Sequence, residues 1–138
     1  MKGKGILGIG IDLVENDRME AVIERWGARF KDKVFSPAEQ AYCDSKGFPA
    51  QHYAGRFAIK EAVTKALGTG MGPLVAWRDI EVERDENTGA PSVRLSPRVR
   101  RMIGSGEILV SLSHTRRYAV AQALWIAPAS RQRGGSRN

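Results

Sequence analysis

The sequence predicts an α+β fold, in which an antiparallel sheet packs against a long helix, for a chain of 138 residues. Three observations support this class. One strand pattern opens the chain, helical patterns fill the next part, and pairs of strand patterns joined by short links follow. With 42% apolar and 27% charged residues, the chain can also bury a core. We expect one domain over residues 1–127 and a basic disordered tail over residues 128–138.

The first expected element is a buried strand over Ile6–Val14, whose two glycines favour close backbone approach. Asp12 is the exception in this strand, because a buried carboxylate is costly unless it is paired or binds a cation. An amphipathic helix follows, with a capping box at Asp17–Glu20 and apolar residues at helical spacing up to Phe30. Its other face carries a basic stripe at positions i, i+7 and i+11: Arg18, Arg25 and Arg29.

Two further helices are expected. Ser36, Pro37 and Glu39 form a second capping box, and the helix that they begin ends near Gly47. The longest helical pattern covers Pro49–Leu67 and stops at a glycine-rich loop. Its apolar residues fall on one arc of a helical wheel, and the opposite side carries Glu61 and Lys65.

Two pairs of strands complete the expected fold, with a short helix between the pairs that begins after Ser96. The first pair is Trp77–Glu83 and Ser92–Leu95, joined by a hairpin turn at Asp85–Gly89; the second is Ile108–Ser113 and Tyr118–Ile126, joined by a tight link.

Charge and composition narrow the possible functions. The formal charge is +7, of which three charges lie on arginines of the expected tail. The rest suits an anionic partner, which could be a nucleic acid, a phosphorylated small molecule or an acidic protein. No apolar run reaches the length of a membrane span and the first residues lack a secretory signal, so we expect a cytoplasmic protein without a membrane partner. One cysteine, Cys43, and two histidines cannot build a Cys/His zinc cluster, so a metal would bind oxygens.

Asp12 and Glu61 are the candidate metal ligands. One carboxylate from a strand and one from a helix form a sparse oxygen site, which suits Mg²⁺ that keeps waters and shares a substrate's phosphates. Phe57 lies on the same helix face as Glu61 and Lys65, which suggests that the pair is covered. The alternatives are that Asp12 forms a salt bridge to an arginine or caps backbone groups at the strand end, and that Glu61 and Lys65 form a solvated pair.

The last tight link, His114 to Arg117, places an imidazole, a hydroxyl and two guanidinium groups in one loop, which suits phosphate binding. The alternative is a turn held by polar contacts. Ser113 and His114 do not form a nucleophile–histidine pair, because adjacent strand residues point to opposite faces.

Three segments form a combination that is specific, although each is weak alone. They are Gly8-Ile9-Gly10-Ile11-Asp12 with Arg18 following, Arg56 to Ala66, and Ser111-Leu112-Ser113-His114. In this order they resemble the holo-[acyl-carrier-protein] synthase family of phosphopantetheinyl transferases, and the similarity runs from Ile6 to Ile126. The resemblance implies the 4′-phosphopantetheinyl transferase fold and a homotrimer with sites between subunits.

The implied reaction is the Mg²⁺-dependent transfer of 4′-phosphopantetheine from coenzyme A to a serine of apo acyl carrier protein. It releases adenosine 3′,5′-bisphosphate and belongs to fatty acid biosynthesis. By position, Asp12 and Glu61 match the family's Mg²⁺-binding carboxylates. Lys65 matches a lysine of the family that contacts the phosphates. These three are the predicted catalytic residues. The predicted coenzyme A contacts are Arg56, Lys65, Ser113, His114 and Thr115.

The resemblance also implies that Arg18 begins the helix that docks the carrier protein. Arg25 and Arg29 share its stripe, and an acidic carrier helix would complement the three charges. The serine proton would pass to Glu61 or to a metal-bound water, and the choice stays open.

Two alternatives compete with this function. A nucleic-acid-binding module would use the basic residues, but it leaves Asp12 and Glu61 without a purpose, and the chain lacks zinc-finger spacing and an RNP-type aromatic run. The second alternative is a protein that binds coenzyme A without transferring any group. Nothing in the sequence suggests it, because the matched acidic and basic residues are intact. We therefore expect no nucleic acid partner.

Overall fold

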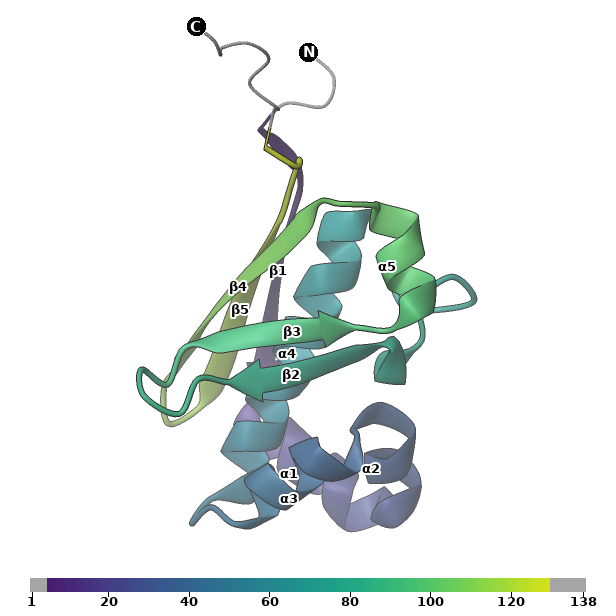
Figure 1. Ribbon diagram of the computed structural model, residues 1–138. Helices are drawn as coiled ribbons and strands as arrows, with labels where there is room; N and C mark the ends of the chain where they lie inside the picture. Colours follow the sequence, from purple (N-terminus) through teal and green to yellow (C-terminus); the bar gives the residue numbers. More distant parts are fainter. Residues whose placement is uncertain (1–4, 130–138) are drawn as a thin grey trace, which may run out of the picture.

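The computed structural model describes residues 5–129 of the chain. Its centre is a three-stranded antiparallel sheet of order β1-β5-β4, and the longest helix, α4, packs along one face of this sheet (Figure 1). The bounds are Ile6–Glu15 for β1, Pro49–Leu67 for α4, Glu107–His114 for β4 and Tyr118–Ile126 for β5. The predicted α+β class is confirmed. The expected tail falls mainly on residues 130–138, which lie outside the described residues.

A separate hairpin lies in front of α4 in Figure 1, and its second strand packs beside β4. It consists of β2 (Ile80–Arg84) and β3 (Pro91–Leu95), and the helix α5 (Pro97–Ile103) follows it. The strand expected from Trp77 begins three residues later, because Trp77–Asp79 form the 3-10 turn η1. The Asp79 carboxylate closes this turn by accepting the backbone N–H of Ala76 at 2.8 Å.

Three short helices gather at one end of the molecule: α1 (Asn16–Trp26), α2 (Ala28–Val34) and α3 (Pro37–Asp44) (Figure 1). The single helix expected up to Phe30 is wrong, because the chain breaks at Gly27 with φ of 53°.

The capping box expected at Asp17–Glu20 is also wrong, because α1 begins directly after β1 without a side-chain cap. The second box is confirmed at the start of α3. The Ser36 N–H donates to Glu39 Oε1 at 2.8 Å, and the Glu39 N–H donates to Ser36 Oγ at 3.2 Å.

Strand β1 and helix α4 approach each other closely because the β1 residues that face the helix are glycines. A Cβ on Gly8 would lie 1.8 Å from the carbonyl oxygen of Ala66, and one on Gly10 would lie 2.0 Å from that of Ala62. Strand residues two apart share a face, so Asp12 continues this row toward α4. The close approach therefore brings Asp12 beside the helix.

The opposite face of the sheet is apolar and exposed. Ile9, Ile11 and Leu13 of β1 each keep 60–61% of their surface exposed, and Leu109 of β4 lies 48% exposed. Such a face marks an interaction site more often than a free surface. No helix within residues 5–129 is long and apolar enough to cross a membrane.

Candidate active site

Asp12 is held by a lysine from α4. Lys65 Nζ donates to Asp12 Oδ1 at 3.1 Å and to the carbonyl oxygen of Ile11 at 3.0 Å. The Asp12 side chain is 17% exposed and that of Lys65 is 50% exposed, so the lysine can still reach outward. The strand carboxylate is therefore paired with a lysine, not with an arginine.

Glu61 lies one turn before Lys65 and faces the same cavity as Asp12. Burial raises the pKa of Glu61, the nearby charge of Asp12 raises it further, and Lys65 lowers it. The solvated Glu61–Lys65 pair is not formed, because the hydrogen bonds of the Lys65 ammonium go to β1. Two carboxylates thus line one cavity, and a cation bound between them would relieve their repulsion.

The cavity that they face has a volume of about 580 Å³, a size typical of small-molecule sites. Its wall is apolar on one side, where Phe57 stacks on Trp77 with ring centroids 4.8 Å apart. Arg18 and Val22 of α1 also line the cavity. Phe57 thus lines the same cavity as the two carboxylates.

The carboxylates form an incomplete metal site. Within the described residues 5–129, no three His, Cys, Asp or Glu side chains group closely enough to hold a metal. A cation at Asp12 and Glu61 would need further oxygens from waters or from a bound phosphate, which is how Mg²⁺ is usually held. The residues present therefore fit Mg²⁺ together with a phosphorylated substrate.

A second, smaller hollow of about 180 Å³ collects the predicted residues Arg56 and His114. Arg56 is only 6% exposed, its guanidinium lies 4.1 Å from the centre of the Tyr42 ring, and its Nε has no hydrogen-bond partner. The rings of His52 and His114 lie 6.0 Å apart, and burial together with the Arg56 charge lowers the pKa of both.

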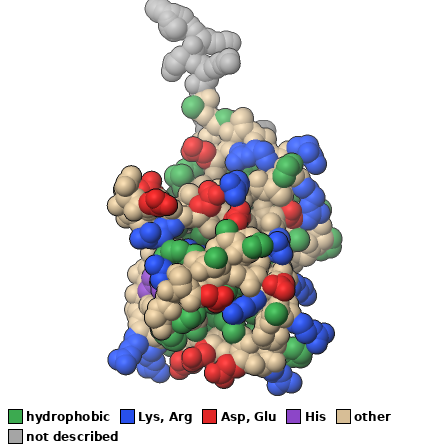
Figure 2. Space-filling model, turned by 60° about the horizontal axis from the view of Figure 1, so that its bottom comes forward, with side chains coloured by type: hydrophobic (Ala, Val, Ile, Leu, Met, Phe, Trp, Pro, Cys, Tyr) green, Lys and Arg blue, Asp and Glu red, His purple; other side chains and the backbone are tan. Residues whose placement is uncertain are grey.

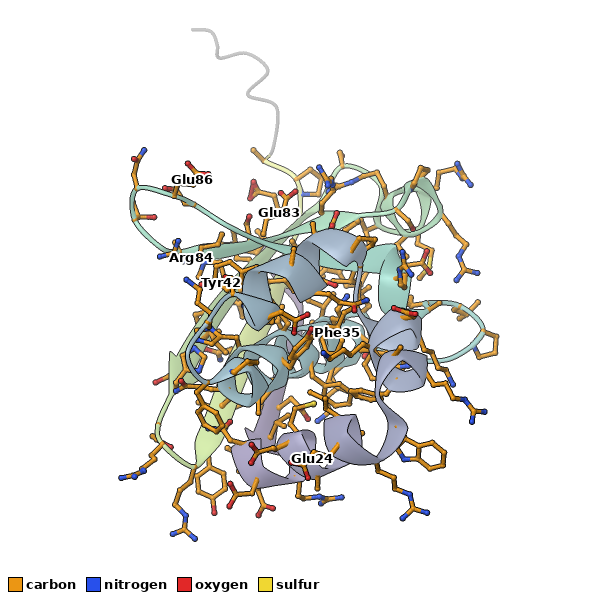
Figure 3. All side chains as sticks on the ribbon, turned by 90° about the horizontal axis from the view of Figure 1, so that it is seen from below. Glu24, Phe35, Tyr42, Glu83, Arg84 and Glu86 are labelled. Carbon is orange, nitrogen blue, oxygen red and sulfur yellow. The ribbon has the colours of Figure 1, made fainter. Side chains whose placement is uncertain are left out.

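The hairpin adds a second arginine to this hollow. Arg84 lies 5.9 Å from the centre of the Tyr42 ring, and Figure 3 shows these two labelled side chains close together below the hairpin turn. A buried guanidinium with an unpartnered donor, next to another arginine, is suited to bind an anion.

Ser113 and Thr115 lie outside both hollows. Ser113 is exposed and pairs with Val120 in the sheet. The Thr115 hydroxyl accepts the backbone N–H groups of Arg117 at 3.2 Å and Tyr118 at 3.0 Å, so it holds the turn between β4 and β5. The two hollows share no lining residue, so one copy of the chain does not bring all the predicted residues together.

Two contacts of the site were not foreseen. Asn16, fully buried, donates through Nδ2 to the carbonyl oxygens of Arg116 at 3.0 Å and Thr115 at 3.3 Å. It thereby ties the turn after His114 to the start of α1. An asparagine between a strand and a helix signals a local cap, and only the folded chain reveals the distant turn as its partner.

The other is a buried ion pair beneath the site, in which Lys60 Nζ lies 3.0 Å from Glu39 Oε1. Lys60 also donates to the carbonyl oxygens of Trp77 and Ile80, and Glu39 Oε2 accepts the N–H of Val82 at 2.7 Å. The pair joins α4 to α3 and β2. In the sequence, the only indication of this ion pair is that Lys60 lies next to the apolar residues of α4.

The predicted docking arginines do not form one helical stripe, because Gly27 separates α1 from α2. Arg18 lines the large cavity. Arg25 and Arg29 both lie over the ring of Trp26, at 5.1 Å and 5.8 Å from its centre. Arg25 and Arg29 therefore meet at the ring of Trp26.

Comparisons with known proteins agree on one family. A family model described as the 4′-phosphopantetheinyl transferase superfamily matches residues 8–123. A holo-[acyl-carrier-protein] synthase of Protochlamydia amoebophila is 47% identical over 119 residues, which cover 86% of this chain and 97% of that protein.

Solved structures give the same result. The holo-[acyl-carrier-protein] synthase of Helicobacter pylori in complex with coenzyme A has a TM-score of 0.78 and 32% identity, covering 85% of this chain and 98% of that one. The Bacillus anthracis holo-(acyl-carrier-protein) synthase in complex with CoA (3′,5′-ADP) has a TM-score of 0.75 and 32% identity, covering 89% and 98%.

Proposed function

The chain belongs to the holo-[acyl-carrier-protein] synthase family within the 4′-phosphopantetheinyl transferase superfamily, and we propose that Asp12, Glu61 and Lys65 carry out its chemistry. It is a transferase that moves 4′-phosphopantetheine from coenzyme A to a serine of apo acyl carrier protein and releases adenosine 3′,5′-bisphosphate. The observation that supports the assignment of the site is that carboxylates from β1 and α4 line one cavity and that Lys65 of α4 donates to the first of them, Asp12.

Asp12 and Glu61 would hold Mg²⁺. Their oxygen-only donor set and the effect of the Asp12 charge on the pKa of Glu61 support this role. The ion would supply positive charge to the pyrophosphate oxygens when bound. Lys65 Nζ, half exposed beside Asp12, would add a second positive charge to the phosphates, where negative charge grows during transfer.

The carrier serine must lose its proton as it attacks, and Glu61 or a water would accept it. A Glu61→Gln variant separates these options. An unaltered pH–rate profile, with metal binding retained, would remove Glu61 from the role of base.

Arg56 and His114 would bind the nucleotide end of coenzyme A. The unpartnered Nε of the buried Arg56 and the cations around Tyr42 support an anionic group there. Ser113, from the exposed face of β4, and Thr115, from the turn that follows, would complete the contacts from a neighbouring subunit.

A homotrimer would bring the two hollows of neighbouring copies together. The exposed apolar face of Ile9, Ile11 and Leu13 supports an interface with a second copy, because contiguous exposed apolar side chains mark interaction surfaces. We expect the Ile11→Asp variant to be a monomer in analytical ultracentrifugation. We also expect it to lack transfer activity. Leu74→Asp, at an equally exposed leucine in a loop, is the matched control. A trimeric, active Ile11→Asp variant would contradict the interface.

Arg18, Arg25 and Arg29 would dock the acidic carrier protein. Charge reversal at Arg18 or Arg25 should raise the KM for carrier protein far more than the KM for coenzyme A, because the charges steer only the protein partner. Arg101→Glu, on α5, controls for net charge. Equal effects on both KM values would contradict this docking surface.

The cytoplasm is the proposed compartment, and fatty acid biosynthesis is the proposed pathway, because the relatives are named for a carrier of acyl groups. Cys43 is buried, and burial raises the pKa of its thiol to about 12, which fits an inert thiol. The nucleic-acid alternative loses support, since Figure 2 shows acidic side chains interspersed with lysines and arginines.

The site is tested by Asp12→Asn and Glu61→Gln, assayed for transfer to apo carrier protein by mass spectrometry. Each should lower kcat/KM by roughly a hundredfold or more, because a charge that stabilises the transition state is lost. Retained thermal stability would show that the fold is intact. Full activity in either variant would overturn the assignment.

A further inference from the structure

Trp26 ends α1 with 47% of its surface exposed, so packing in the core does not explain its place. Two guanidinium groups cover its ring instead. Those of Arg25 and Arg29 lie 5.1 Å and 5.8 Å from the ring centre, within the range of cation–π attraction. The three residues form one group, which we term the tryptophan clamp.

The helix is interrupted within the clamp. Arg25 belongs to α1 and Arg29 to α2, and Gly27 turns the chain between them with φ of 53°. Helical spacing therefore cannot align the two arginines. The ring between them does, because it attracts both guanidinium groups.

The two arginines have no acidic partner in the part of the chain that the structure describes, since neither forms a salt bridge within residues 5–129. Two like charges held at one ring repel each other, and an anionic surface from outside would relieve this repulsion. The arrangement is thus suited to an acidic partner.

The position of the clamp indicates which partner this is. Val22, four residues before Trp26 on α1, lines the catalytic cavity, as does Arg18. Residues four apart are neighbours on a helix face, so the clamp continues the rim of the cavity. A protein that presents its serine to the cavity would also cover this rim.

We propose that Trp26 is a positioning residue for carrier-protein docking, which orients Arg25 and Arg29 toward an acidic surface of the acyl carrier protein. The exposed part of the ring gives the partner an apolar contact within this charged surface. Aromatic and arginine side chains are the ones that most often dominate protein interfaces. The inference rests on the proposed function, because it names a contact for that substrate.

Steady-state kinetics of the full chain test the role. Trp26→Ala should raise the KM for apo carrier protein by roughly five- to thirtyfold, the effect of two exposed cation–π contacts, and leave the KM for coenzyme A unchanged. Trp26→Phe should restore most of the loss, because a smaller ring still attracts guanidinium groups. Phe48→Ala, at another exposed aromatic residue, is the matched control and should change neither KM.

A double-mutant cycle separates positioning from a purely structural role. Arg29→Ala should cost much less carrier affinity in the Trp26→Ala background than in the wild type, because the guanidinium is no longer oriented there. Trp26→Leu keeps apolar bulk without the ring and should behave like Trp26→Ala, even if the alanine variant folds poorly.

Three results would overturn the inference: a carrier KM for Trp26→Ala no higher than for Phe48→Ala, additive effects in the cycle, or a wild-type carrier KM in Trp26→Leu. Wild-type protein is assayed in parallel. A wild type without transfer activity would overturn the proposed function and the inference with it, whereas an active wild type with unaffected variants overturns the inference alone.

Discussion

Replacing Gly10 with alanine should push β1 away from α4 and misplace the catalytic groups. The added Cβ would lie 2.0 Å from the carbonyl oxygen of Ala62 and 2.9 Å from Cβ of Lys65. Real Cβ contacts are not shorter than 3.0 Å, so the strand and the helix must separate by about 1 Å. The Lys65–Asp12 bond of 3.1 Å would then exceed hydrogen-bonding distance.

This displacement sets the size of the expected effect. A shift of about 1 Å in catalytic groups can cost about a hundredfold in rate, so kcat/KM should fall by roughly that factor. Overpacking of a tight contact should also lower the free energy of unfolding by about 1–3 kcal/mol. The two losses have one cause, because the contact that stabilises the fold also places Asp12.

Transfer to apo carrier protein, followed by mass spectrometry, measures the rate, and urea denaturation measures the stability. Gly47→Ala is the matched control, because a Cβ there would have no atom within 4 Å and the backbone φ is not positive. A Gly10→Ala variant with the rate and stability of the control would refute the link between the close approach and the site.

Three more predictions concern residues around the site. Lys60→Met should lower the free energy of unfolding by about 3–5 kcal/mol, because the buried carboxylate beside it loses its cation; a loss below about 1 kcal/mol in urea denaturation would contradict this. Arg56→Met should raise the pKa of both histidines toward the ordinary value of 6.5, since the Arg56 charge helps to lower them. The unfolded wild-type chain binds more protons just below that pH, so stability should fall as the pH drops below 6.5, and less so in Arg56→Met. NMR titration of His52 and His114 checks the shift, and unchanged values would count against it. Asn16→Leu should raise the KM for coenzyme A roughly tenfold, through two lost hydrogen bonds to the turn after His114, without changing the KM for carrier protein; equal changes in both KM values would exclude this role.

Local signals in the sequence predicted the elements whose ends are set locally. The helix α4 begins and ends where expected, because proline fits the first turn and Gly68 adopts the left-handed conformation at its end. The capping box of Ser36 forms for the same kind of reason.

The break at Gly27 could not be predicted from periodicity, because apolar spacing continues across it to Phe30. The sequence placed the start of α1 at a capping box on Asp17, whereas the helix begins at Asn16. The Asn16 side chain donates to a turn about a hundred residues away. The first error overlooks a glycine that adopts a positive φ, and the second arises from a tertiary contact that local preference does not reveal.

The members of the candidate site were proposed from the resemblance, and they stay predictions; the structure adds which of them contact one another. Family resemblance singled out Asp12, Glu61 and Lys65, and in the fold the two carboxylates line one cavity while Lys65 donates to Asp12. That Lys65 pairs with Asp12, and not with Glu61 on its own helix, follows from the close approach of strand and helix. The separation of Arg56 into a second hollow likewise depends on packing that no local pattern encodes.

Metal-dependent transfer is the most direct test of the proposal that Asp12 and Glu61 hold a cation for phosphopantetheine transfer. Apo carrier protein is incubated with this protein and coenzyme A, with Mg²⁺ or with EDTA, and its mass is measured. We predict a gain of one phosphopantetheine group with Mg²⁺ only, and none with the Asp12→Asn variant. Equal modification in EDTA, or full modification by the variant, would contradict the proposed site.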